Sequence, residues 1–147
     1  MDAFQQAIGA KVSTSKTVGE SDVYLFAGIT GDFSPNHVDE VAMAATPYGG
    51  RIAHGALLVG YMSRASTLIT DQCAALMMEH FPVSLGYDRI RFLEGVRIGD
   101  TVTVSYTIET ADPERMRTIA AVAIHNQAGT CCAVATHIMR WLKRQGS

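Results

Sequence analysis

The spacing of hydrophobic and polar residues changes from a helical to a strand-like pattern near the middle of the chain. Residues 54–70 are apolar on almost every side, which is typical of a helix enclosed by other structure. From residue 84 onward polar and apolar residues alternate, which predicts strands with one buried face. The predicted strands cover residues 84–92, 101–109, 116–125 and 131–142, with turns at residues 99–100, 112–114 and 126–129.

The first half of the chain predicts shorter elements. Residues 11–18 alternate loosely and predict a first strand, and residues 21–28 have the acidic start and glycine stop of a short helix. Another helix is expected to begin at Ser34-Pro35 and to continue to Ala45, before a Pro- and Gly-containing loop at residues 46–50. Pro82 is expected to end the segment that follows the long helix.

Together these elements predict an α+β protein in which a strongly curved antiparallel sheet wraps around one long central helix. This packing buries a helix that is apolar nearly all round. The sheet is expected to be a meander of about four strands joined by the N-terminal strand, with one edge open to a second subunit. A length of 147 residues fits one domain with its own core, so we expect a single domain over residues 1–147.

Composition and charge exclude several classes of protein. The formal net charge is -2, whereas a nucleic-acid-binding domain carries a basic stripe. Three cysteines, two of them adjacent, do not form a disulfide framework, so we expect a reducing, cytoplasmic compartment. The N-terminus does not read as a signal peptide. The most apolar window, residues 52–69, is interrupted by His54, Ser63 and Arg64 and does not predict a membrane span.

The candidate chemistry centres on Asp32 and His37, five residues apart across a turn. Ser34 is placed to cap the helix that follows, and Pro35 suits its first position. Asp32 then lies in the loop before the helix and His37 in its first turn, so the two side chains come near each other. A carboxylate beside an imidazole can activate a water molecule as a general acid/base pair.

Gly55 stands where the long helix begins. A backbone N–H there is free and is reinforced by the helix dipole, which suits an oxygen that gains negative charge, such as a thioester carbonyl going to an enolate. These parts suffice to add water across a double bond conjugated to a carbonyl. The sequence has no phosphate-binding glycine loop, metal-ligand cluster or dinucleotide fingerprint, so neither a metal nor another cofactor is expected.

Residues 26–39, which include Gly31-Asp32 and Asn36-His37, resemble the hydratase-2 motif of the MaoC-like, (R)-specific enoyl-CoA hydratases, which are hotdog-fold enzymes. Residues 52–58 match the sequence that follows this motif, and residues 84–92 and 96–104 are similar to strands of the family's sheet. The resemblance implies reversible hydration of a trans-2-enoyl-CoA to the (R)-3-hydroxyacyl-CoA. It also implies a homodimer, with active sites near the subunit interface and no metal or redox cofactor.

The resemblance also implies roles for single residues. Asp32 and His37 would hold and activate the water and return a proton to the α carbon, and Gly55 would donate its N–H to the thioester oxygen. Ser63 matches a serine that supports activity in some members. Two residues depart from the motif: Ser34 replaces an asparagine, and Asn36 replaces an aliphatic residue. Ser34, Asn36 and Ser63 are therefore our candidate substrate-binding residues.

Three other functions stay open at this point. Hotdog folds also host acyl-CoA thioesterases, and a dehydratase of this family can act on acyl carrier protein thioesters. Thioesterases of this fold commonly place a carboxylate on the central helix, whereas residues 56–70 contain no Asp or Glu. Binding of an acyl thioester without catalysis would leave the Asp–His pair unexplained.

Structural explanations also exist for several of these residues. Asp32 could simply cap a turn, and Gly55 could serve only a tight turn. His54 is interpreted as a structural residue that holds the turn before the helix. Three basic residues are interpreted as a solvated strand face, with contact to a CoA phosphate as the alternative: Arg89, Arg91 and Arg97. Three apolar residues are interpreted as core or interface, with the lining of an acyl pocket as the alternative: Met77, Met78 and Phe81.

Overall fold

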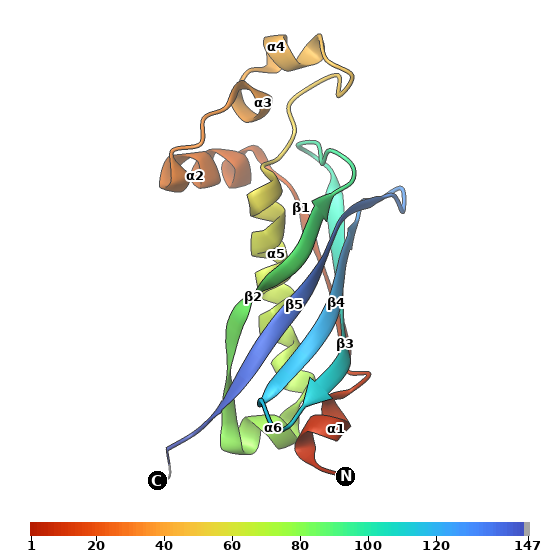
Figure 1. Cartoon of the computed structure of the whole chain (residues 1–147). Helices are drawn as coiled ribbons and strands as arrows, with labels where there is room; N and C mark the ends of the chain where they lie inside the picture. The colour runs from red at the N-terminus through yellow and green to blue at the C-terminus, as the bar shows by residue number, and fades with distance from the viewer. Residues whose placement is uncertain (146–147) are drawn as a thin grey trace.

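The computed structural model describes residues 1–145, so the last two residues of the predicted domain lie outside the described part. Five antiparallel strands form one sheet in the order β1-β3-β4-β5-β2. The sheet curves around one side of helix α5, as Figure 1 shows, and this confirms the predicted hotdog arrangement. The strands are β1 Lys11–Thr17, β2 His80–Phe92, β3 Thr101–Asp112, β4 Arg117–His125 and β5 Cys131–Lys143.

The central helix α5 spans Gly55–Leu68 and continues as a 3-10 helix, Ile69–Gln72. Its buried side, with Leu58, Met62 and Ala65, packs against the apolar face of the sheet. The alternating burial of β3 and β4 supplies that face, as the period-2 pattern predicted. The helix is not enclosed on every side, however, because one face that includes Ser63 and Arg64 is exposed.

Three details of the sheet differ from the sequence-based expectation. The strands are not a simple meander, because β2 pairs with β5 and not with β3. Pro82 does not end a segment but lies inside β2, where an edge strand tolerates a residue without an N–H. Residues 96–100 contribute only a single bridge, Ile52 to Arg97, before β3 begins at Thr101.

Short helices cover the two ends of α5. At one end lie α1, Ala3–Ala7, and α6, Ala74–Glu79, near both chain termini (Figure 1). At the other end α2, α3 and α4 project beyond the sheet (Figure 1). Their bounds are Glu20–Thr30, Pro35–Val38 and Glu40–Ala44. The predicted continuous helix to residue 45 is interrupted at Asp39, whose carboxylate accepts the Ala42 N–H at 2.9 Å and caps α4.

The remaining observations concern membranes and thiols. Within residues 1–145, none of the helices is long and apolar enough to cross a membrane. All three cysteines are free, and burial raises the pKa of the Cys73 thiol to about 11.

Candidate active site

Asp32 lies in the loop that connects α2 to α3, and His37 lies within α3. Helix α2 ends at Gly31, whose left-handed backbone (φ 80°) turns the chain toward Asp32. The Asp32 carboxylate accepts the Ser34 N–H at 3.2 Å, and Pro35 occupies the first turn of α3 as predicted. The Ser34 side chain makes no capping hydrogen bond, so its predicted capping role is wrong. The backbone of this turn is instead held by Asp32.

The protonation of the His37 ring follows from its hydrogen bond. Nδ1 of His37 lies 2.7 Å from the backbone oxygen of Ile52, which can only accept, so Nδ1 carries the proton. Nε2 then presents a lone pair toward Asp32 Oδ2, 4.0 Å away. Two acceptors at this separation do not bond directly, but one water molecule between them can donate a proton to each. Its oxygen lone pairs would remain free to attack a substrate.

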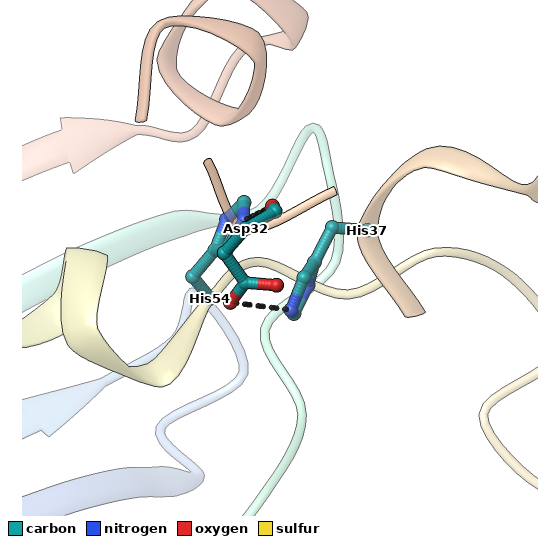
Figure 2. A group of neighbouring side chains, drawn as sticks. All are labelled: Asp32, His37 and His54. Atoms are coloured by element: carbon teal, nitrogen blue, oxygen red, sulfur yellow. Dashed lines mark hydrogen bonds and ion pairs between the residues drawn. The ribbon is translucent and has the colours of Figure 1, made fainter. Parts of the chain in front are cut away.

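A second histidine, His54, lies next to both residues (Figure 2). Its Nε2 lies 2.9 Å from the backbone oxygen of Asp32, and its ring stacks on His37 with a centroid separation of 3.7 Å. His54 is 2% exposed, and the centroid of its ring lies 4.7 Å from that of the Phe26 ring. His54 therefore contacts both catalytic candidates, in addition to its predicted place in the turn before α5.

Gly55 is the first residue of α5, as predicted, so its N–H has no acceptor within the helix. The Phe92 ring, at the end of β2, packs directly over Gly55. A Cβ atom at Gly55 would lie 2.6 Å from that ring, so only glycine fits here without moving the aromatic side chain. The sequence contains no signal for this contact, because residue 92 is far from residue 55 along the chain.

A cavity of about 270 Å³ lies beside these groups. His37 and Gly55 line it together with Phe92 from β2 and residues of the following loop. Asn36, one of the three candidate substrate-binding residues, also lines it. Ser34 and Ser63 are not among its lining residues. The full lining is Asn36, His37, Tyr48, Ile52, Ala53, Gly55, Leu58, Phe92, Leu93, Glu94, Gly95 and Val96.

Two arginines fasten the loops around the cavity. The Arg51 guanidinium bonds to Glu20 of α2 and Glu40 of α4, and these hydrogen bonds lower the pKa of both carboxyl groups. Arg97 donates to the backbone oxygens of Tyr48 at 2.7 Å and Gly49 at 3.2 Å. Arg97 is thus engaged in holding the loop that carries Tyr48, and is not simply a solvated residue.

The ligand-type atoms of Asp32, His37 and His54 lie within 4.8 Å of one another, which raises the question of a metal ion. A metal binds imidazole nitrogen in the ring plane at about 2.0–2.1 Å. The two rings are stacked, with centroids 3.7 Å apart and an angle of only 24° between their planes, so in-plane lone pairs of both rings do not point at one ion. One nitrogen of each ring also faces a backbone carbonyl. The arrangement fits a hydrogen-bonded acid/base site better than a metal centre.

Other candidates lie away from this cavity. Ser63 is exposed, two turns into α5, and its carbonyl accepts the Ser66 hydroxyl at 2.7 Å. Met77 and Met78 border a shallow surface hollow beside Thr70, and Phe81 is exposed on β2. None of these three apolar side chains lines the cavity beside His37.

The comparisons with known proteins agree with this architecture. A profile of the family described as MaoC like domain matches residues 3–130. The (R)-specific enoyl-CoA hydratase of Rhodospirillum rubrum is 36% identical over 107 residues, covering 73% of this chain and 69% of that protein. The 3-hydroxybutyryl-CoA dehydratase of Methylorubrum extorquens is 35% identical over 111 residues, covering 75% and 65%.

The fold is shared with a solved structure, the (R)-hydratase of A. caviae involved in PHA biosynthesis. That chain superposes with a TM-score of 0.72 and 24% identity, covering 90% of this chain and 95% of the other. A likeness at this identity shows the fold alone. The family profile extends over most of the sequence, and the Rhodospirillum relative shares more than a third of the aligned residues. From these two matches, the chain belongs to the MaoC-like domain family.

Proposed function

We propose that the chain catalyses the reversible hydration of a trans-2-enoyl-CoA to the (R)-3-hydroxyacyl-CoA. The observation that carries this proposal is the 4.0 Å gap between Asp32 Oδ2 and His37 Nε2, which matches one water molecule, beside a cavity that Gly55 also lines. The names of the relatives from Rhodospirillum rubrum and Methylorubrum extorquens support both the reaction class and a CoA thioester.

In this mechanism the water held by Asp32 and His37 attacks the β carbon and gives one proton to the pair. The electrons of the double bond move toward the carbonyl, and the enolate oxygen that forms accepts the Gly55 N–H at the positive end of α5. The pair then returns one proton to the α carbon. One water molecule is added in total, and no electron is exchanged with a cofactor.

An assay with crotonyl-CoA tests the reaction. We expect the enoyl absorbance to fall without release of free thiol. Release of free thiol would instead identify an acyl-CoA thioesterase, because hydrolysis frees CoA whereas hydration does not. Turnover of enoyl-acyl carrier protein, but not of enoyl-CoA, would identify the carrier-protein enzyme. Among the described residues of α5 there is no Asp or Glu, which favours hydration over thioester hydrolysis.

Gly55→Ala should lower kcat by up to about 10²-fold, the lower limit for complete loss of an oxyanion donor, because the N–H is displaced and not removed. The added methyl group would meet the Phe92 ring, so that either the ring or the start of α5 must shift. Steady-state kinetics with crotonyl-CoA measure the change. Gly60→Ala on the same helix is the control, because nothing lies within 4 Å of its added Cβ. Equal kcat values for the two variants would contradict the role of Gly55.

A homodimer is the proposed assembly, formed along the free edge of β2. This strand pairs only with β5, and alternate residues Phe81, Val83 and Leu85 are exposed although apolar. An unpaired edge with apolar side chains favours association with another chain. Light scattering after size exclusion should give twice the mass of one chain. Val83→Lys should shift the protein toward the monomer, whereas a purely monomeric unsubstituted protein would contradict the proposal.

A further inference from the structure

His54 lies closer to both members of the Asp32–His37 pair than its interpretation as a turn residue requires. Its Nε2 is 2.9 Å from the backbone oxygen of Asp32, and its ring covers that of His37 at 3.7 Å. Asp32 lies in the loop before α3 and His37 within that helix, and half of the Asp32 side-chain surface is exposed. The Ile52 carbonyl holds His37, and the Ser34 N–H holds the Asp32 carboxylate. The His54 side chain contacts both residues.

We propose that His54 is the positioning residue of the active site, which sets the separation of Asp32 and His37 without touching the substrate. This inference rests on the proposed hydration reaction. His54 itself is rigid, because it is the residue that immediately precedes α5, is 2% exposed and has Phe26 against its ring. It therefore links the start of the central helix to both Asp32 and His37.

The hydrogen bonds determine the state of the His54 ring. The Asp32 backbone oxygen can only accept, so Nε2 of His54 carries the proton. Nδ1 of His54 is buried and, among residues 1–145, has no hydrogen-bond partner. The N–H at Nε2 is thus the one polar contact of the His54 ring among residues 1–145, and it is made with Asp32.

His54 performs two separable functions, and different substitutions remove each of them. His54→Phe retains a ring that stacks on His37 but loses the N–H toward Asp32. His54→Gln retains a donor but loses the ring, and His54→Leu loses both. Because a small misplacement of reacting groups is costly, we expect kcat to fall about 100-fold for His54→Leu and about 10-fold for each of the other two. KM should change less than about twofold, because His54 does not line the cavity.

His80 provides the matched control. It is also buried, its Nδ1 contacts the backbone oxygen of Leu76 at 3.2 Å, and its ring packs against Phe4 at 5.7 Å. It lies at the start of β2, at the end of α5 opposite the active site (Figure 1). His80→Phe should therefore leave kcat unchanged, even if it lowers the melting temperature. Circular dichroism of every variant shows whether a fall in kcat is accompanied by loss of the folded structure.

A second readout does not depend on activity. The ring of His54 shifts the proton resonances of the stacked His37 ring, so NMR spectra of the histidine C–H groups should show His37 moving in His54→Gln and not in His80→Phe. Folded His54 variants with unchanged kcat, or with raised KM and unchanged kcat, would overturn the proposal. So would an unmoved His37 resonance. If the unsubstituted protein hydrates no enoyl thioester, the proposed function fails, whereas the NMR spectra still show whether His54 stacks on His37.

Discussion

Asp32→Asn is expected to lower kcat by about 10²- to 10⁴-fold, the usual contribution of a general acid/base group. An asparagine can still accept the Ser34 N–H, so the turn before α3 should persist. Its uncharged amide cannot take a proton from water. Its NH₂ group would also donate to the free Nε2 of His37 and so close the gap in which the water is expected. Initial rates with crotonyl-CoA measure the loss.

Asp39→Asn is the control for this substitution. Asp39 lies seven residues away in the same projecting segment, where its carboxylate caps α4. Asparagine caps helices about as well as aspartate, so fold and kcat should both be retained. If Asp32→Asn kept a kcat close to that of Asp39→Asn, Asp32 would have no part in the proton transfer.

The second large effect concerns stability and pH, and it arises from His137 on β5. This residue is fully buried, with Nε2 2.8 Å from the Ser84 hydroxyl, Nδ1 2.7 Å from the Tyr106 hydroxyl and Tyr87 stacked on its ring. Burial lowers the pKa of His137 from 6.5 to about 4. The unfolded chain therefore binds a proton at this histidine between pH 6.5 and 4 while the folded chain does not.

Under linkage, the free energy of unfolding is highest above pH 6.5 and falls as the pH drops toward 4. The loss due to His137 is about 3 kcal/mol once the pH is below 4. Urea unfolding at several pH values measures it. His137→Gln removes the titrating group, so the difference in stability between the two proteins should shrink or reverse as the pH falls. Parallel pH curves for the two proteins would show that His137 does not contribute.

Much of the fold could be predicted because it follows from local spacing. The alternation in residues 101–109 and 116–125 identified β3 and β4, and the apolar run after residue 54 identified α5. The pairing of the strands could not be predicted from local spacing, since the choice of β5 rather than β3 as the partner of β2 depends on the curvature of the whole sheet. Pro82 was misinterpreted for the same reason, because only its edge position makes a proline acceptable there.

The candidate site divides in the same way. Asp32, His37 and Gly55 could be chosen from the sequence, because a capped turn and a helix start place them within a few residues of recognisable signals. The cavity positions of Phe92 and Tyr48 and the contacts of His54 could not, because they join segments that are distant along the chain. Ser34 shows the limit of a local rule: the position favoured a side-chain cap, but the Asp32 carboxylate holds the backbone there instead.

The sequence by itself thus determined most element types, the central helix and the choice of Asp32 and His37 as the proposed acid/base pair, since each depends on periodicity or on neighbours within one turn. Only the tertiary structure decided the 4.0 Å separation of Asp32 and His37, the stacked His54 next to them and the Phe92 ring over Gly55. Those features arise where α5 meets the projecting segment and the end of β2. Packing between remote segments, and not local propensity, fixes distances of that kind.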